Sequence, residues 1–209
     1  MAILALAAGA ANAGIIYDNG TPDNQGYFES DLGVDLNPRT ADDFTLAQAA
    51  TIRDVHWWGL YYPRSGALPD VDAFTIEIYA MVSGAPADGP PDHSIHVGDV
   101  GRTATGGFLP GSGPEVYKYD VGGLSIPLAA GTYALCIVND TTGNDRDWQW
   151  ARGHLGGTMW TKTDATLWEQ VAYSSRVAFY LTDDVPPVPE PAGLGLIGLA
   201  MLGLRRKRS

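Results

Sequence analysis

The chain has 209 residues, a length that suits one β-sandwich or barrel domain once its two ends are set aside. Its 24 acidic residues outnumber its 13 basic residues, which makes the formal net charge −11. Residues 1–184 hold nine basic and 23 acidic residues, because four of the cations and one carboxylate lie in the C-terminal segment. Nucleic-acid phosphates and anionic headgroups repel so acidic a body, so we expect no nucleic-acid partner. Cations and neutral polysaccharide remain compatible with this charge.

Residues 1–13 have the pattern of a secretory signal peptide. The segment is apolar up to Asn12 and ends in Ala11-Asn12-Ala13, which fits the A-x-A form of a cleavage site. It lacks the usual positively charged start, so we expect the true start of translation to lie upstream of Met1. The mature protein is then expected to begin near Gly14.

Residues 14–184 are predicted to form an all-β domain, an antiparallel β-sandwich with jelly-roll-like connections. Short runs of β-forming residues alternate with clusters of Gly, Pro, Asn and Asp, which is typical of this class. The single cysteine, Cys136, excludes a disulfide within the chain. The nine predicted strands are residues 15–17, 43–46, 52–62, 73–82, 93–103, 116–121, 132–139, 147–152 and 176–182.

The alternation of side chains predicts which strand faces are buried. In residues 73–80, Phe74, Ile76 and Ile78 share one face and are expected in the core, while Thr75, Glu77 and Tyr79 are expected in solvent. Residues 132–139 are apolar on both faces, which predicts a central strand. Cys136 lies in this run with no base or cation beside it, so we interpret it as a small buried side chain and not a nucleophile.

The six tryptophans include three candidates for carbohydrate binding: Trp58, Trp148 and Trp150. Trp148 and Trp150 are two residues apart, so on a strand their rings point the same way and could stack on sugar faces. The alternative is that these rings fill the interior, because large aromatic side chains carry much of the buried area of a sandwich. Trp57 and Trp58 are consecutive, so one of them must point away from the main core.

A polar loop at residues 139–147 is a candidate site for a structural Ca²⁺ ion. Asp140, Asn144, Asp145 and Asp147 carry the oxygen ligands that Ca²⁺ prefers. Their spacing does not match the EF-hand loop, and Asp and Asn also occur in such loops because they cap their own backbone N–H groups. No other cofactor is indicated.

The sequence gives little support for catalysis, and we expect the protein not to be an enzyme. It contains neither a zinc-binding H-E-x-x-H pattern nor a G-x-S-x-G nucleophile turn. Glycoside hydrolysis by a pair of carboxylates remains an alternative, since the fold and not the sequence sets the distance between the two groups.

The C-terminal segment, residues 185–209, combines three features in a fixed order. A proline-rich spacer leads to Pro189-Glu190-Pro191, residues 192–204 are all Ala, Gly, Leu, Ile or Met, and the cations Arg205, Arg206, Lys207 and Arg208 follow. A helix over residues 192–204 is about 20 Å long at roughly 1.5 Å per residue, shorter than the ~30 Å hydrocarbon layer. The four cations favour a cytoplasmic C-terminus.

This order of motif, short apolar helix and basic stop resembles the PEP-CTERM sorting signal of bacterial surface proteins. An ordinary tail anchor with a chance Pro-Glu-Pro is the alternative. The resemblance implies recognition of Pro189-Glu190-Pro191 by an exosortase, a transient inner-membrane anchor, and export to the cell surface or beyond. It also implies an exopolysaccharide-producing, biofilm-forming setting. The stretches Asp42-Asp43-Phe44 and Gly131-Thr-Tyr-Ala-Leu135 look like those in other ectodomains with this tail.

These observations predict a secreted, non-catalytic ectodomain with a structural or adhesive role. A carbohydrate-binding, lectin-like module is the alternative, followed by a glycoside hydrolase. The exposure of the tryptophans discriminates between the first two, because sugar binding requires exposed rings and a structural role does not.

Overall fold

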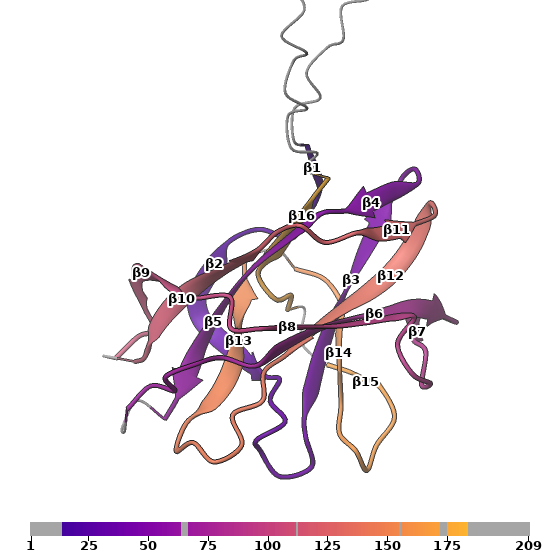
Figure 1. The fold of residues 1–209 in the computed structure, drawn as a ribbon. Coiled ribbons are helices and arrows are strands. Elements are labelled where there is room, and N and C mark those ends of the chain that lie inside the picture. Colours follow the sequence, from indigo (N-terminus) through magenta and orange to yellow (C-terminus); the bar gives the residue numbers. More distant parts are fainter. Residues whose placement is uncertain (1–13, 64–66, 112, 155, 172–174, 184–209) are drawn as a thin grey trace, which may run out of the picture. The chain divides into compact units, whose positions relative to one another are not determined.

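The computed structural model describes residues 14–63, 67–111, 113–154, 156–171 and 175–183 (Figure 1). These residues belong to one compact unit, residues 14–184, which is all-β and built from antiparallel sheets. The predicted signal peptide, proline-rich spacer and C-terminal helix lie outside the described residues. The jelly-roll-like order of connections stays a prediction.

The described residues form sixteen strands, many of them short: β1 (Ile15–Asp18), β2 (Pro22–Glu29), β3 (Arg39–Leu46), β4 (Ala50–Ile52), β5 (Asp54–Tyr62), β6 (Phe74–Val82), β7 (Ala85–Pro86), β8 (His93–Gly98), β9 (Thr103–Phe108), β10 (Glu115–Val121), β11 (Ile126–Leu128), β12 (Gly131–Val138), β13 (Asp147–Gly153), β14 (Met159–Lys162), β15 (Glu169–Gln170) and β16 (Phe179–Thr182).

The first sheet is organised around β5. One edge of β5 pairs with β10, which in turn pairs with β9. The other edge is shared: β16 pairs with the first half of β5, and β13 pairs with the second half. Strands β1 and β2 complete the sheet beside β16 and β13.

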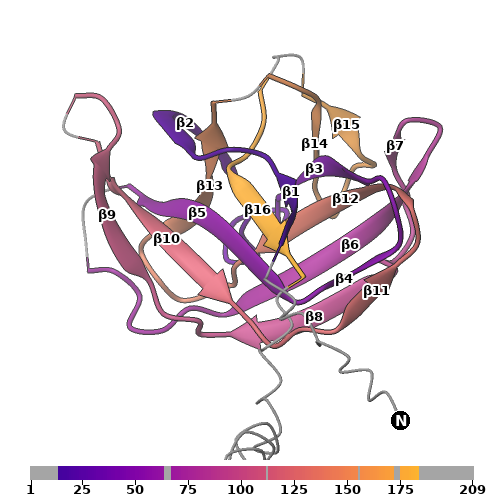
Figure 2. The same ribbon diagram turned by 90° about the horizontal axis from the view of Figure 1, so that it is seen from above.

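The second sheet has the order β15-β14-β3-β12-β6, with β7 and β8 along the far edge of β6. Strand β12 therefore lies between β3 and β6, and this confirms the central position predicted for residues 132–139. Strands β4 and β11 form a separate pair. Viewed from above, β9, β10 and β5 lie to one side and β3, β12 and β6 to the other (Figure 2).

The main core lies between the two sheets and contains side chains from both. Phe74 of the second sheet inserts among rings of the first. Its centroid lies 5.2 Å from that of Trp57, 4.8 Å from that of Tyr119 and 5.1 Å from that of Trp148, all near right angles. Such edge-to-face contacts add stabilisation beyond the burial of apolar area.

Each sheet also carries a smaller apolar cluster on its outer face. On the second sheet, Trp160 and Trp168 cover Ala134 and Cys136 of β12. This explains why residues 132–139 are apolar on both faces, and it confirms Cys136 as a buried side chain whose thiol pKa is raised by burial. On the first sheet, Trp58 packs with Leu60, Val116 and neighbouring side chains.

The expectation that Glu77 and Tyr79 face solvent is wrong. Their side chains do lie opposite Phe74, Ile76 and Ile78, but the outer cluster covers them, and they are 8% and 2% exposed. Alternation correctly separates the two faces of a strand, yet it does not reveal that a distant segment packs over the second face.

Two predicted strands prove to be interrupted. The strand expected at residues 52–62 breaks at Arg53, so that β4 pairs with β11 while β5 joins the first sheet. The strand expected at residues 93–103 ends at Gly98, which has a positive φ of 64°, and β9 begins separately. Strands β2, β7, β11, β14 and β15, and most of β4 and β9, lie outside the predicted strands.

Candidate functional site

The sorting signal lies outside the residues that the structure describes. This applies to Pro189, Glu190 and Pro191, to the apolar run at residues 192–204, and to the basic stop from Arg205 to Arg208. In the part of the chain that is described, no helix has the length and apolar character of a membrane span.

The structure places Trp148 and Trp150 in the core, which corrects the interpretation of these residues as a sugar-stacking pair. Both are 0% exposed. They do point the same way from β13, but into the main core. Gly59 of β5, which pairs with Trp150, leaves room there for the Trp148 ring. The indole Nε1 of Trp150 donates a hydrogen bond to the Ala178 carbonyl at 3.1 Å.

Trp58 points outward, as its position next to Trp57 requires, but its ring is covered. It is 8% exposed, and the Lys118 ammonium lies 6.0 Å from its ring centroid and 5.6 Å from that of Tyr180. Lys118 is held there by an ion pair of 2.7 Å with Asp120. The ring of Trp58 is therefore covered by the protein's own side chains.

The polar loop before β13 is organised by turn chemistry and by a buried carboxylate. The Asp140 carboxylate accepts a hydrogen bond from the Thr142 N–H at 3.0 Å, and the Asn144 amide donates to the Thr141 carbonyl at 3.1 Å. Asp31, far away in the sequence and fully buried, accepts hydrogen bonds from the backbone and hydroxyl of Thr141 at 3.1 and 2.9 Å. Burial raises the pKa of Asp31, and these donors oppose the rise.

The three carboxylates among the proposed Ca²⁺ ligands, Asp140, Asp145 and Asp147, do not form a metal-binding group. Asp140 and Asp145 are exposed, and Asp147 begins β13. Throughout the described ranges, no three His, Cys, Asp or Glu side chains are grouped closely enough to hold a metal ion.

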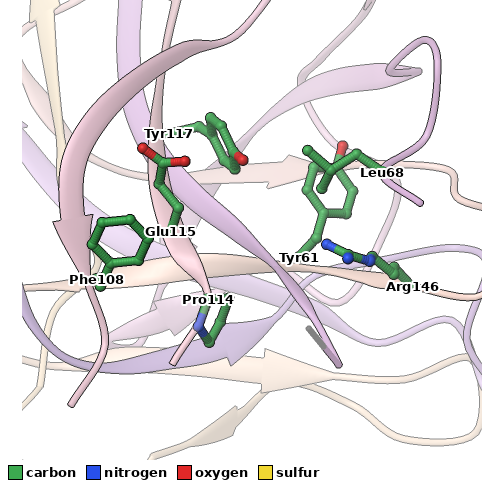
Figure 3. Close-up of a pocket in the computed structure, with 7 residues that line it drawn as sticks. All are labelled: Tyr61, Leu68, Phe108, Pro114, Glu115, Tyr117 and Arg146. Atoms are coloured by element: carbon green, nitrogen blue, oxygen red, sulfur yellow. The ribbon is translucent and has the colours of Figure 1, made fainter. Parts of the chain in front are cut away.

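A cleft of about 320 Å³ opens at the end of the first sheet, and we call it the aromatic cleft (Figure 3). It is formed where β5 ends, at the turn between β9 and β10, and where the 139–147 loop returns to β13. The lining residues are Tyr61, Leu68, Phe108, Pro114, Glu115, Tyr117 and Arg146.

Strand register explains why one wall of the aromatic cleft carries these side chains. Phe108 of β9 lies directly opposite Glu115 of β10, and Tyr117 follows two residues later on the same face. Figure 3 shows these three side chains on one side of the cleft, with Tyr61, Leu68 and Arg146 on the other. Phe108 is 47% exposed. Tyr119, which follows Tyr117 by two residues on β10, is fully buried. The aromatic row of the core thus continues outward into the cleft.

Hydrogen bonds hold the Tyr61 wall in place. The Tyr61 hydroxyl donates to the buried carboxylate of Asp72 and accepts a hydrogen bond of 3.0 Å from the Asn139 amide. The Arg102 guanidinium lies 5.2 Å from the Tyr61 ring centroid, and its Nε is 3.6 Å from Asp72 Oδ2. Burial raises the pKa of Asp72, an effect that Arg102 partly offsets.

Partial burial and the neighbouring Glu115 carboxylate raise the pKa of Tyr117. The Tyr117 hydroxyl is protonated at neutral pH, as a tyrosine hydroxyl ordinarily is, and it donates a hydrogen bond to Glu115. The aromatic cleft thus places aromatic rings beside a carboxylate, an arrangement that suits a polyhydroxylated molecule.

A second cleft, of about 410 Å³, lies on the outer face of the second sheet. The Lys162 ammonium lies 4.7 Å from the Tyr79 ring centroid and 4.5 Å from that of Trp168. Burial lowers the pKa of Lys162. Glu77 accepts a hydrogen bond of 2.8 Å from the Tyr79 hydroxyl and lies 3.7 Å from Arg39 Nε. These charged groups are used in contacts with one another, which indicates a structural role.

The residues of the aromatic cleft were not among the sequence candidates. Residues 103–108 were not predicted as a separate strand, so the pairing of Phe108 with Glu115 could not be anticipated. The available signal was the alternation in Glu115-Val-Tyr-Lys-Tyr119, whose aromatic positions share a face.

Comparison with known proteins identifies the C-terminal segment. Residues 187–208 match the family model described as the PEP-CTERM protein-sorting motif. The chain carries a PEP-CTERM sorting signal. The match begins two residues before Pro189 and ends at Arg208, so it contains all three predicted features.

The PEP-CTERM signal implies export, recognition by an exosortase and processing at the cell envelope. It covers only the C-terminal segment and leaves the activity of the domain open. No curated protein and no solved structure matches the chain.

Proposed function

We propose that this chain is a secreted ectodomain that an exosortase delivers to the cell surface, where it has a non-catalytic structural or adhesive role. In this proposal residues 1–13 belong to a signal peptide, and residues 192–204 hold the protein in the inner membrane until the exosortase acts. The exopolysaccharide and biofilm setting is part of the proposal. The observation that carries it is the match of residues 187–208 to the sorting motif.

The arrangement of the domain supports a structural role. Its largest aromatic side chains are buried in the core. The outer face of each sheet carries a further buried apolar cluster. An acidic, closely packed β-domain of this kind suits exposure to solvent outside the cell, since its net charge opposes non-specific association.

The sorting step is tested by replacing Pro189, Glu190 and Pro191 with alanine in a bacterium that has an exosortase. We expect the variant to keep its C-terminal segment and to remain in the inner-membrane fraction, whereas the wild-type protein loses the segment. The measurements are the mass of the mature protein and its distribution between membrane, surface and medium. Sequencing of the mature N-terminus, expected at Gly14, tests the signal peptide.

Pro186→Ala provides the matched control, because Pro186 lies in the same proline-rich stretch but outside the matched residues. This variant is expected to be processed as the wild type is. Normal trimming and localisation of the triple-alanine variant would refute the proposal.

A lectin-like module is the second candidate function, and the aromatic cleft is the observation that favours it. Trp148 and Trp150, which the sequence offered as the sugar-binding residues, are buried and cannot contact a saccharide. Any saccharide must instead meet Phe108 and Tyr117, which lie at the end of the first sheet.

A further inference from the structure

We propose that the aromatic cleft is a binding site for a neutral saccharide, with Phe108 as the stacking surface and Glu115 as the acceptor for sugar hydroxyl groups. This inference rests on the second candidate function above, and it assigns that function to a specific site. Delivery by the exosortase does not depend on it.

The chemistry of the cleft fits a sugar because two kinds of group lie side by side. One face of a pyranose ring presents C–H groups, which pack favourably on the electron-rich face of an aromatic ring. Its edge presents hydroxyl groups, which need hydrogen-bond acceptors and donors. Phe108 and Glu115 are directly paired across β9 and β10, so a sugar stacked on the ring has its hydroxyl groups beside the carboxylate.

The opposite wall makes the site rigid. Tyr61 is 1% exposed and is tied to Asp72 and Asn139, so its position does not depend on a ligand. Arg146, on the same wall, comes from a loop anchored by buried Asp31. A pre-formed wall reduces the entropy lost on binding.

The size of the cleft limits the ligand. Its volume of about 320 Å³ lies at the lower end of the ~300–1,000 Å³ typical of small-molecule sites. This suits one or two sugar units of a chain and not a long continuous stretch of polymer.

Charge selects a neutral sugar over an acidic one. Residues 1–184 hold 23 acidic and nine basic residues, so the field around the domain repels a polyuronate. Glu115, one of these acidic residues, lies in the cleft together with Arg146, so the selection comes from the field of the whole domain. A neutral hexose polymer avoids this repulsion and still satisfies the carboxylate through its hydroxyl groups.

The test measures binding of the full chain, purified in a mild detergent, to soluble polysaccharides by affinity electrophoresis and calorimetry. The probes are dextran, a soluble β-glucan and a galactomannan, with polygalacturonate as the acidic comparison. We expect binding to at least one of the neutral polymers. Phe108→Ala should weaken it about tenfold, and Glu115→Gln about fivefold.

Leu167→Ala is the matched control, because Leu167 is an exposed apolar residue, 66% accessible, that lines the second cleft. It should bind as the wild type does, and circular dichroism should show all variants folded.

Two different failures can be told apart. Neutral-polymer binding that survives both Phe108→Ala and Glu115→Gln would overturn the assignment of the cleft while leaving the lectin-like function standing. Absence of binding by the wild type, or a preference for polygalacturonate, would overturn both. None of these results bears on the sorting step.

Discussion

Arg176 and Asp42 join the two sheets: the Nη1 atom of Arg176 lies 3.5 Å from Oδ1 of Asp42. Asp42 is on β3 of the second sheet, and Arg176 immediately precedes the segment that leads into β16 of the first. The other carboxylate oxygen of Asp42 accepts hydrogen bonds from Asn19 Nδ2 at 2.8 Å and from the Val177 N–H at 2.9 Å. Arg176 also contacts Asp43, with Nη2 3.1 Å from Oδ1. The carboxylates of Asp42 and Asp43 on β3 thus bind residues near both ends of the domain, Asn19 on one side and Arg176 and Val177 on the other.

This arrangement gives a physical role to the Asp42-Asp43-Phe44 stretch. In the second sheet these residues pair directly with Leu135, Ala134 and Tyr133, which belong to the Gly131-Thr-Tyr-Ala-Leu135 stretch. The rings of Phe44 and Tyr133 stack with centroids 5.7 Å apart. The two stretches noted separately in the sequence are therefore halves of one strand pair.

Asp42→Asn should change how stability depends on pH. Burial raises the pKa of Asp42 to about 7, and Arg176 only partly offsets this. The ordinary pKa of an Asp is about 3.9, so between these values the folded state holds the proton more tightly than the unfolded state. This group therefore stabilises the fold more at low pH, and its contribution is lost as pH rises toward 7, by up to ~1.4 kcal/mol per pH unit.

The measurement is urea unfolding of both proteins between pH 4 and pH 8. Other buried carboxylates, such as Asp31 and Asp72, titrate in both proteins, so the difference between the two curves isolates Asp42. We expect the free energy of unfolding of Asp42→Asn to fall less steeply with rising pH. Parallel curves would show that the Asp42 carboxyl does not titrate in this range.

Gly59→Ala should destabilise the domain by about 1–3 kcal/mol, because it overpacks a site that cannot expand. A Cβ atom at Gly59 would lie 2.5 Å from the Trp148 ring, which is itself fully buried against Phe74. The measurement is the free energy of unfolding in urea.

The control for this substitution is Gly89→Ala, since an added Cβ at Gly89 meets nothing within 4 Å. We expect that variant to stay within about 0.5 kcal/mol of the wild type. In a double-mutant cycle, Trp148→Phe should relieve part of the cost of Gly59→Ala. Equal stability of the two glycine variants would contradict the predicted clash.

Trp148→Ala should cost about 3–5 kcal/mol of stability, because it leaves a large cavity where both sheets meet. A sugar-stacking surface residue would instead lose binding with little change in stability. Urea unfolding followed by circular dichroism separates the two cases, with Leu167→Ala as an exposed reference expected within about 0.5 kcal/mol. A Trp148→Ala protein as stable as Leu167→Ala would place the ring outside the core.

The main strands, and the faces that they bury in the core, were largely predictable from the sequence. Phe74, Ile76 and Ile78 pack in the main core as their alternation indicates, and Cys136 is buried as its apolar surroundings suggest. These predictions succeed because a strand's side chains alternate with a period of two and apolar runs seek burial.

The sorting signal is the feature that the sequence determined by itself. Pro189-Glu190-Pro191, the apolar run and the basic stop are adjacent in the chain, so their order is readable without any fold. Local chemistry of this kind needs no contact between distant segments.

Only the tertiary structure decided the use of the tryptophans and the place of the aromatic cleft. Whether Trp148 faces sugar or core depends on Gly59 and Phe74, which lie on other strands. The pairing of Phe108 with Glu115 likewise depends on the register of a hairpin. The physical reason is the same in each case: strand periodicity determines which residues share a face, while only the packing of distant segments determines what that face meets.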